Sequence, residues 1–285
     1  MITTQIDHKT QPAGAKGSGS PDPEVLLECR DVAISFGQVR ALKGASITAR
    51  RGEVTAIVGD NGAGKSTLIR CVSGIHRPDH GEIWFDGEEV TFKTPEDARA
   101  GGIETVHQNL ALVEDLTVWQ NLFLNREITR GMGPLSFLDR ATMKREAERM
   151  VSGLAVNVPA VGSRVRRLSG GQRQAVSICR AAGFDSKLII MDEPTAALGV
   201  QETARVEELV LRLKSEGHAI VLISHNFAQV LRLSDAVWIM RAGHAVAGRR
   251  TAHTTGDEIV ALITGADPGD QAHLNLAAPT QEGAS

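Results

Sequence analysis

The spacing of hydrophobic and polar positions changes several times along the chain, and each change marks a different kind of element. Near the start, short segments rich in apolar and β-branched residues follow one another and are interrupted by Gly37 and Gly44. Short runs of this kind between glycines are typical of antiparallel strands. Three segments predict an antiparallel layer: Val25–Cys29, Val32–Phe36 and Ala45–Thr48.

A parallel sheet is predicted further along the chain. The apolar run Val54–Val58 leads into a glycine-rich turn, and Lys65–Ser73 continues as a short helix that stops at Gly74. Two more apolar runs, Leu188–Met191 and Ile220–Ile223, predict strands of the sheet interior. The helix between them is indicated by four apolar residues at the i, i+3, i+4, i+7 spacing: Val206, Leu209, Val210 and Leu213. Strands that alternate with helices predict an α/β core.

Strand signals are sparse between Leu110 and Arg167, where a helical period is the main pattern. Five apolar residues keep this period opposite a charged face: Met143, Ala147, Met150, Val151 and Leu154. We therefore expect a helical subdomain over about residues 110–167, set into the α/β core.

The two ends of the chain differ in composition from its centre. Two β segments, Ala236–Met240 and Ala245–Ala247, and a helix over Asp257–Ile263 are predicted before Gly265. Residues 1–24 are small and polar, with no apolar stretch of a signal peptide, and residues 266–285 are rich in Ala, Gly, Pro and Gln. We expect a disordered lead, one domain over residues 25–265, and a disordered tail.

Charge, cysteine content and apolar run lengths narrow the functional classes. The 285 residues carry a net charge of −3, which does not favour nucleic acid as a partner. Cys29, Cys71 and Cys179 lack metal-ligand spacing and predict small core residues in a reducing compartment. No apolar run approaches the roughly 18 residues of a membrane-spanning helix. A membrane function would therefore need another chain to cross the bilayer.

The turn after Val54–Val58 carries a phosphate-binding pattern. It matches G-x-x-x-x-G-K-[ST] in the required place, after a buried strand and at the start of a helix. Glycines allow the backbone N–H groups and the helix N-terminus to approach a phosphate chain. Lys65 is expected to reach the outer phosphates of a nucleotide and Ser66 to bind Mg²⁺. The nucleotide-binding segment is Gly59, Asp60, Asn61, Gly62, Ala63, Gly64, Lys65, Ser66 and Thr67.

Two adjacent carboxylates end the strand Leu188–Met191. Open α/β sheets bind ligands at the carboxyl ends of their strands. Asp192 is expected to hold Mg²⁺ through its coordination shell, and Glu193 to act as the general base that polarises the attacking water. Solvated acidic caps are common at strand ends, but the phosphate-binding segment makes the catalytic interpretation the stronger one.

A third segment, Leu168-Ser169-Gly170-Gly171-Gln172, opens a predicted helix. Ser169, Gly170, Gly171 and Gln172 would present a hydroxyl and backbone N–H groups at a positive helix N-terminus, with no side chain that blocks an anion. In order with the phosphate-binding segment and the carboxylates, it resembles the signature of the ATP-binding cassette (ABC) family. The resemblance covers about residues 25–265. It implies a P-loop NTPase core of ABC type, with an antiparallel β layer and an inserted helical subdomain.

The resemblance also implies how ATP is bound and hydrolysed. In this family two domains pack head to tail, so that each ATP lies between one phosphate-binding segment and the signature of the second subunit. Gln108 is similar to the glutamine that senses Mg²⁺ and the attacking water. His225 resembles the histidine that contacts the γ-phosphate, and Phe36 the aromatic residue that stacks on adenine. Lys65, Gln108, Glu193 and His225 are thus the implied catalytic set.

One position departs from the family pattern. After Pro194-Thr195 the family usually continues Ser-Ala-Leu-Asp, whereas this chain has Ala196-Ala197-Leu198-Gly199. Glycine has no side chain that accepts a hydrogen bond, so communication between the two sites of the dimer is in question. The catalytic residues Lys65, Asp192, Glu193 and His225 are all present.

The resemblance is strongest to the single-cassette ATPases of bacterial simple-sugar importers of the fructose and ribose type. It rests on the Ala-Ala-Leu-Gly run, on Gly59-Asp60-Asn61-Gly62 and on Gly81–Gly87. It implies an ATPase at the cytoplasmic face of the membrane, with transmembrane permease subunits, a second ATP-binding subunit (a homodimer is expected) and, indirectly, an external solute-binding protein. Import of another solute, export, and a non-transport regulatory ATPase remain alternatives.

The helical subdomain is the expected docking element for the permease. It contains more apolar residues near its start than a free surface loop needs, although they also suit a subdomain core. These residues are Leu110, Leu112, Val113, Leu116, Val118, Trp119, Leu122 and Phe123.

Overall fold

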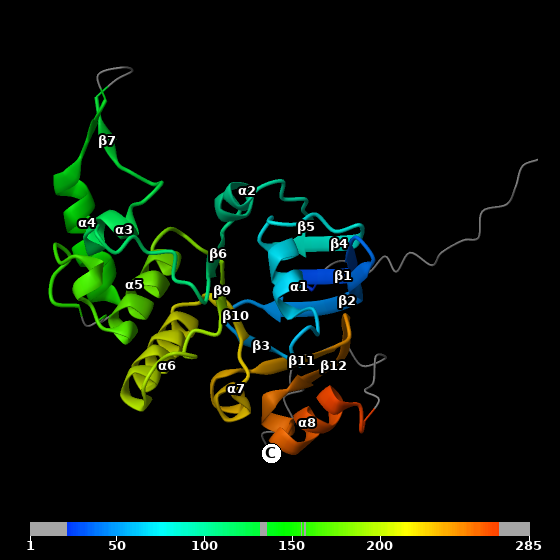
Figure 1. Cartoon of the computed structure of the whole chain (residues 1–285). Helices are drawn as coiled ribbons and strands as arrows, with labels where there is room; N and C mark the ends of the chain where they lie inside the picture. Colours follow the sequence, from blue (N-terminus) through cyan, green and yellow to red (C-terminus); the bar gives the residue numbers. More distant parts are fainter. Residues whose placement is uncertain (1–21, 132–135, 155, 157, 268–285) are drawn as a thin grey trace, which may run out of the picture.

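Two sheets and a lateral group of helices make up the computed structural model, which describes residues 22–131, 136–154, 156 and 158–267 (Figure 1). The expected lead over residues 1–24 and tail over residues 266–285 therefore lie almost wholly outside the described residues. Ordered elements begin at Val25 and end at Thr264.

A six-stranded sheet forms the centre of the fold, with the order β12-β11-β3-β10-β9-β6. All its neighbours pair in parallel except β11 and β12. The strands are β3 (Val54–Val58), β6 (Ile103–Val106), β9 (Leu188–Asp192), β10 (Ala219–Ile223), β11 (Ala236–Arg241) and β12 (His244–Arg250). The parallel α/β core predicted from the apolar runs is confirmed, because three central strands coincide with those runs.

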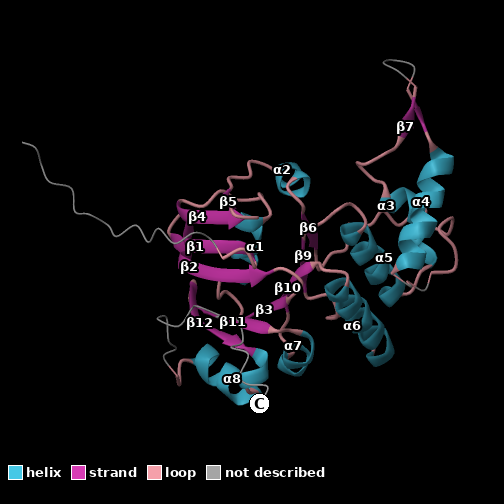
Figure 2. Ribbon diagram, turned by 180° about the vertical axis from the view of Figure 1, so that it is seen from behind, coloured by secondary structure: helices cyan, strands magenta, loops and turns pink. Residues whose placement is uncertain are grey.

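A second, antiparallel sheet has the order β2-β1-β4-β5 (Figure 2). Its strands are β1 (Val25–Phe36), β2 (Val39–Arg50), β4 (His80–Phe85) and β5 (Glu88–Glu89). The antiparallel layer is confirmed, but its division into three short strands near the start is wrong. Val25–Cys29 and Val32–Phe36 form one continuous strand, because an irregularity at Asp31, where φ is +49°, absorbs the break in the pattern without ending the pairing.

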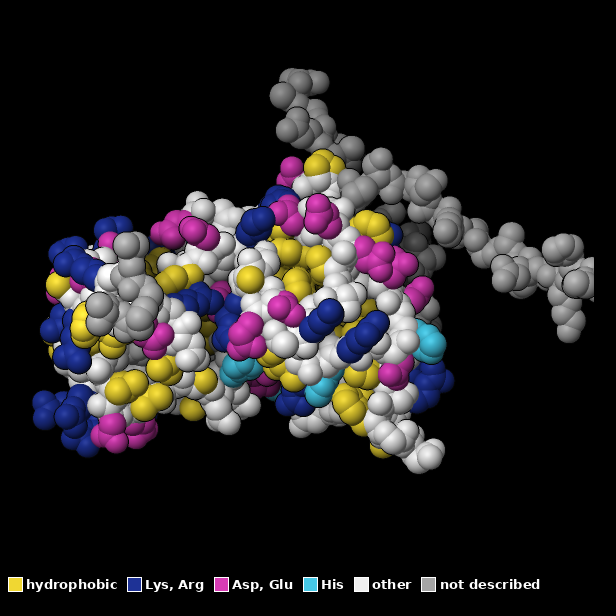
Figure 3. Space-filling view, turned by 90° about the horizontal axis from the view of Figure 1, so that it is seen from above, with side chains coloured by type: hydrophobic (Ala, Val, Ile, Leu, Met, Phe, Trp, Pro, Cys, Tyr) yellow, Lys and Arg dark blue, Asp and Glu magenta, His cyan; other side chains and the backbone are white. Residues whose placement is uncertain are grey.

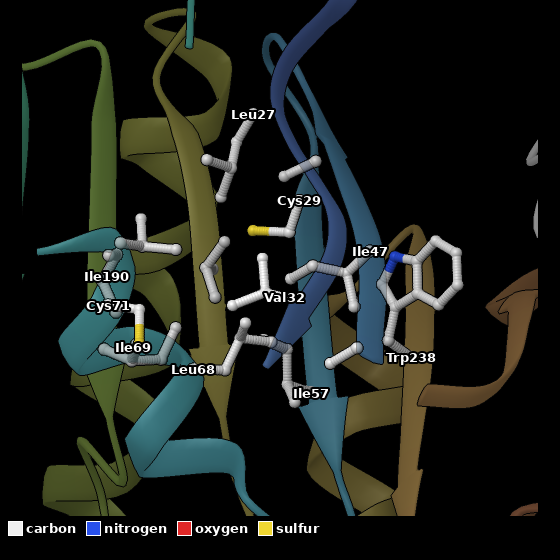
Figure 4. Close-up of a cluster of buried hydrophobic side chains, with 14 of the residues drawn as sticks. Leu27, Cys29, Val32, Ile47, Ile57, Leu68, Ile69, Cys71, Ile190 and Trp238 are labelled. Carbon is white, nitrogen blue, oxygen red and sulfur yellow. The ribbon is translucent and has the colours of Figure 1, made fainter. Parts of the chain in front are cut away.

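The largest core lies between the two sheets and around helix α1 (Lys65–Val72). Side chains from β1, β2 and α1 meet the facing side chains of β3 and β9 there (Figure 4). The indole Nε1 of Trp238 donates to the carbonyl of Thr48 at 2.8 Å, which joins the edge of one sheet to the other. Cys29, Cys71 and Cys179 are buried and free, as their spacing predicted, and burial raises the pKa of the Cys71 thiol to about 11.

Helices cover the opposite face of the parallel sheet and extend to one side of the molecule (Figure 1). They are α3 (Val118–Leu122), α4 (Arg140–Gly153), α5 (Gly170–Ala182) and α6 (Val200–Ser215). Val118, Trp119, Leu122 and Phe123 are buried among them, so half of the apolar residues that suggested a docking surface belong to the subdomain core. The hairpin of β7 (Thr129–Arg130) and β8 (Phe137–Leu138) extends beyond this group.

Smaller elements complete the described chain. Helix α2 (Pro95–Ala100) precedes β6, and α7 (Phe227–Leu233) and α8 (Gly256–Thr264) pack on β11 and β12 around a third apolar cluster. Short 3₁₀ turns lie at Val165–Arg167 and Thr251–His253. The face shown in Figure 3 mixes acidic, basic and apolar side chains, so no charge of one sign dominates it.

Candidate functional site: a phosphate loop beside the two carboxylates that end β9

The loop between β3 and α1 requires glycine at two of its positions. Gly59 has φ +149°, and a Cβ there would lie 2.1 Å from the carbonyl oxygen of Met240. Gly64 has φ +103°, and a Cβ would lie 2.8 Å from a methyl group of Leu42. Both positions therefore exclude side chains for reasons of conformation and of space. The loop lies against β11 and β2, and the N-terminus of α1 follows it directly.

Lys65 is the first residue of α1, and its side chain folds back over the loop. Its ammonium donates to the carbonyls of Gly59 at 2.6 Å and Asp60 at 2.9 Å. The side chain is only 7% exposed, and burial lowers the pKa of Lys65, while the nearby Glu193 and Asp60 carboxylates oppose that shift. The first turn of α1 contains no acidic residue. Its positive end and the ammonium therefore form a region that suits an anion.

Glu193 follows the last residue of β9 in a strained backbone conformation. Its φ is +49°, which is uncommon for a residue with a side chain, and its N–H donates to the carbonyl of Ile223 at 2.9 Å. This hydrogen bond ties the end of β9 to the end of β10. Strain of this kind is retained where the surrounding structure imposes it, often at functional sites.

His225 lies two residues beyond β10 and contacts Glu193 directly. Its Nε2 is 2.5 Å from Oε1 of Glu193, although the two residues are 32 positions apart. The contact joins the ends of the adjacent parallel strands β9 and β10. The structure thus brings together the base and the histidine that the resemblance implied.

A cleft of about 430 Å³ gathers most of the candidate residues. Ten of them line it: Asn61, Gly62, Gly64, Lys65, Ser66, Thr67, Gln108, Asp192, Glu193 and His225. Gly59 and Asp60 contribute the carbonyls that hold Lys65, and the side chain of Ala63 is buried in the core below the loop. Residues from three separate strand ends and from the loop before α1 therefore face one space.

Four lining residues were not identified as site residues from the sequence: Val39, Arg40, Ala41 and Ile223. Ile223 ends β10, and the other three begin β2, directly after the turn that follows Phe36, where Val39 pairs with Phe36 in the hairpin. The Phe36 ring is 45% exposed and contacts the His76 ring edge to face, with centroids 5.0 Å apart. The structure places Phe36 beside the cleft rather than in its lining. Val39 and Phe36 are both exposed, at 66% and 45%, and their pairing in the hairpin forms a rim beside the cleft that no local pattern in the sequence indicates.

The segment Ser169–Gln172 lies away from the cleft, at the start of α5 in the helical part. Ser169 is the N-cap of α5, and its hydroxyl accepts from the N–H of Gln172 while the Gln172 side chain accepts from the N–H of Ser169. This is the reciprocal pattern of a capping box. The structure therefore does not bring Ser169, Gly170 or Gly171 to the chain's own Lys65.

Glu202, on α6, accepts hydrogen bonds from Ser169 and Gly171 of this segment, and the sequence analysis did not identify it. One carboxylate oxygen accepts from the N–H of Gly171 at 3.3 Å and the other from the N–H of Gly199 at 3.4 Å. A hydrogen bond from the Ser169 side chain is the largest cause that lowers the pKa of Glu202, followed by the two backbone bonds. Gly199, which replaces the family's usual aspartate, is thus connected to the signature through Glu202.

The loop that carries Gln108 is fixed to the same helix, α5. Ser177 donates to the carbonyl of Leu110 at 3.3 Å, and Arg180 donates to the carbonyls of Leu110 and Ala111. Ser169 begins α5 and Arg180 lies near its end. A single helix therefore connects the signature segment to the loop that places Gln108 in the cleft.

Comparison with known proteins agrees with this architecture. A family profile described as "ABC transporter" matches residues 42–196. A xylose/arabinose import ATP-binding protein of Sulfolobus acidocaldarius is 44% identical over 84% of this chain and 94% of its own length. A fructose import ATP-binding protein of Rhizobium meliloti is 44% identical over 85% of this chain and 95% of its own length. A ribose import ATP-binding protein of Chromobacterium violaceum is 40% identical, and the match spans 49% of it.

Solved structures give the same result for the fold. The ADP conformation of an ATP-binding cassette of an ABC transporter has a TM-score of 0.68 and 29% identity, and covers 84% of this chain and 95% of that chain. A nucleotide-free cassette has a TM-score of 0.70 and 28% identity, and covers 89% of this chain and 100% of that chain. The fold is that of the P-loop ATPase cassettes.

The chain belongs to the ABC transporter family. Within that family it is an ATP-binding and ATP-hydrolysing subunit. The predicted fold class and the resemblance to single-cassette ATPases of simple-sugar importers are both confirmed by these relatives.

Proposed function

We propose that this chain hydrolyses ATP with Mg²⁺ in the cleft beside Lys65 and so powers the import of a monosaccharide through a separate membrane permease. The observation that carries the proposal is the convergence of Lys65, Ser66, Asp192, Glu193 and His225 on one cleft of about 430 Å³. Two of the similar chains are import ATP-binding proteins for xylose/arabinose and for fructose, which supports a monosaccharide as the transported solute.

The cleft fits the triphosphate of ATP. Two of the three N–H donors of the Lys65 ammonium bind loop carbonyls, and the third is free to bind an outer phosphate oxygen. The α1 N-terminus adds backbone N–H groups and a positive dipole. Phe36, at the rim next to Val39, is the residue we propose to stack on the adenine. The loop from Gly59 to Thr67 thereby holds the phosphates, and the hairpin of β1 and β2 holds the adenine.

The same cleft fits Mg²⁺ bound together with a nucleotide. Ser66, Gln108 and Asp192 offer a hydroxyl, an amide and a carboxylate, which are the oxygen donors that Mg²⁺ prefers. Among the residues that the structure describes, no group of three or more His, Cys, Asp or Glu side chains could hold a metal alone. Mg²⁺ characteristically combines one or two protein oxygens with substrate phosphates and water, and when bound it neutralises charge on the phosphates.

Hydrolysis needs a base for the attacking water. The water oxygen bonds to the γ-phosphorus, the bond from that phosphorus to the bridging oxygen breaks, and ADP and phosphate leave. Glu193 accepts the proton of the water, and His225, held 2.5 Å from Oε1, fixes the carboxylate so that its other oxygen faces the water. Gln108, in the loop after β6, orients the water.

A second subunit completes each site in this proposal. Ser169, Gly170 and Gly171 lie at the start of α5, in the helical part of the chain, and none of them lines the cleft that contains Lys65. Donors at a helix N-terminus suit the γ-phosphate of an ATP held by another copy. We propose a head-to-tail homodimer with two ATP molecules between the subunits.

Transport requires a membrane chain. In the described part of this chain no helix has the length and apolarity to cross a bilayer. We propose that the protein acts at the cytoplasmic face of the membrane, on transmembrane permease subunits that receive solute from an external binding protein.

The test combines catalysis and transport. Lys65→Ala should lose ATP binding and turnover, whereas Glu193→Gln should retain binding and hydrolyse about 100- to 10,000-fold more slowly. The permease that co-purifies in mild detergent, reconstituted with the wild-type chain, should accumulate a labelled monosaccharide only with ATP. Normal turnover by Glu193→Gln would remove the proposed base, and ATP-driven uptake of a different class of solute would replace the monosaccharide.

A further inference from the structure

Behind the Glu193–His225 contact lies a buried amide, Gln229, on α7. Its side chain is 1% exposed, and its backbone N–H donates to the side chain of Asn226, the N-cap of α7, at 3.1 Å. An amide buried to this extent must find hydrogen-bond partners for both its oxygen and its nitrogen.

The partners of Gln229 belong to the two loops that carry the catalytic pair. The Ser224 hydroxyl donates to Oε1 of Gln229 at 2.9 Å, and Ser224 directly precedes His225. The Thr195 hydroxyl lies 3.0 Å from Nε2 and 3.2 Å from Oε1, and Thr195 is two residues after Glu193. One side chain therefore bridges the loop after β9 and the loop after β10.

The orientation of this amide is fixed by Glu207 on α6. Nε2 of Gln229 donates to Oε1 of Glu207 at 3.0 Å. A carboxylate only accepts hydrogen bonds, so the amide must direct its nitrogen to Glu207 and its oxygen to the Ser224 hydroxyl. Arg232 pairs with the same carboxylate at 2.5 and 3.1 Å and holds it in place.

The Gln229 side chain connects the two loops at a point where the strand pairing has already ended. The last paired residues of β9 and β10 are Asp192 and Ile223, so the catalytic side chains lie beyond the ladder. On one side these loops border a cleft of about 390 Å³, lined by Glu193, Thr195, Ala196, Ser224, His225 and Asn226. Gln229 supports them from the protein interior.

We infer that Gln229 is a positioning residue that sets the separation of Glu193 and His225 through Thr195 and Ser224. It does not touch the reacting atoms. The inference rests on the proposed roles of Glu193 and His225 in hydrolysis. A shift of about 1 Å in catalytic groups costs on the order of 100-fold in rate, so the expected effect lies in turnover rather than in nucleotide affinity.

The structure supplies a reciprocal exchange as a test. Gln229→Glu places a carboxylate against the Glu207 carboxylate, and the two repel each other. The double variant Glu207→Gln/Gln229→Glu restores one donor and one acceptor, with the amide now on α6 and the carboxylate still accepting from Ser224 and Thr195. Gln201→Glu, an exposed position on α6, makes the same charge change away from the pair and is the matched control.

The full chain should be assayed for ATP turnover, KM for ATP and thermal midpoint in each variant. We expect Gln229→Glu to lower kcat by about 10- to 100-fold with KM within about 2-fold of wild type, the double variant to recover to within about 3-fold, and Gln201→Glu to be unchanged. A double variant that melts like the wild type but remains as slow as Gln229→Glu overturns the inference.

Glu193→Gln, assayed in parallel, distinguishes failure of the inference from failure of the proposed function. If Glu193→Gln is inactive and Gln229→Glu turns over at the wild-type rate, Gln229 has no positioning role while the proposed base stands. If Glu193→Gln turns over normally, the proposed catalytic pair is wrong and the inference about Gln229 falls with it.

Discussion

Nε2 of His225 lies 2.5 Å from Oε1 of Glu193, and this contact joins two loops that follow neighbouring strands of the parallel sheet. Glu193 reaches the contact with φ at +49°, held by a hydrogen bond from its N–H to the carbonyl of Ile223. The contact fixes one oxygen of the Glu193 carboxylate. Glu193 and His225 both line the cleft that also contains Lys65.

Removing the imidazole should impair turnover and spare binding. In His225→Ala the Glu193 carboxylate loses its partner and its fixed orientation, so we expect kcat to fall by about 100-fold or more. Nucleotide affinity, measured by titration with a fluorescent ATP analogue, should change little because Lys65 and the phosphate loop are intact. Wild-type kcat in His225→Ala would show that the contact does not serve hydrolysis.

The phosphate loop should tolerate a methyl group at one glycine and not at another. Gly59→Ala places a Cβ 2.1 Å from the Met240 carbonyl oxygen, so the loop must move, and we expect a loss of about 2–4 kcal/mol in unfolding free energy together with weak ATP binding. Gly62→Ala also has positive φ, but nothing lies within 4 Å of its Cβ, and it should lose less. Urea unfolding of both variants measures the difference, and equal losses would contradict the steric cause.

Glu202 should compete with the γ-phosphate for the donors of the signature. Its carboxylate binds the N–H of Gly171, and its pKa is lowered chiefly by a hydrogen bond from Ser169, so it is ionised at neutral pH. Glu202→Gln removes this negative charge beside the signature. We therefore expect ATP-dependent association of subunits at a protein concentration about 3- to 10-fold lower than for the wild type. Glu208→Gln, exposed on the same helix, is the control. Weaker association in Glu202→Gln would mean that the carboxylate supports the signature instead.

Permease crosslinks should arise from the exposed part of the segment after Gln108. Asn109, Ala111 and Val113–Asp115 are exposed, whereas Trp119, Leu122 and Phe123 are buried in the subdomain core. Single cysteines at Asn109 and Asp115, treated with a short crosslinker in membranes, should capture a permease loop. A cysteine at Glu88, on the antiparallel sheet, is the control, and capture only from that position would place the docking surface elsewhere.

The sequence predicted the central strands because they are uniformly apolar and buried on both faces. Leu188–Met191 and Ile220–Ile223 each differ from the observed strand by one residue. It also placed the phosphate loop, since glycines followed by Lys65 and Ser66 after a buried strand rarely occur outside nucleotide-binding loops. The antiparallel layer was predicted less well, because the irregularity at Asp31 interrupts the alternation of apolar residues without interrupting the pairing of β1.

The contacts that Glu202 and Gln229 make with distant segments could not be predicted. Glu202 and Gln229 act through partners 31 and 34 residues away, and neither lies in a recognisable motif. A Glu at the third position of a helix and a Gln in an amphipathic helix are ordinary residues until the fold brings α6 and α7 next to the signature and the catalytic loops. Val39 at the rim of the cleft was missed for a related reason, since only the hairpin geometry places it beside Phe36.

The central claim is that each ATP site is shared between two subunits, and the oligomeric state tests it most directly. By light scattering, the full chain with Glu193→Gln should be a monomer without nucleotide and a dimer with ATP and Mg²⁺. Adding Ser169→Arg puts a large side chain where the γ-phosphate of the other subunit's ATP must lie, and this double variant should remain a monomer with ATP while it still binds nucleotide. Dimerisation of both variants at the same ATP and protein concentrations would contradict the shared site.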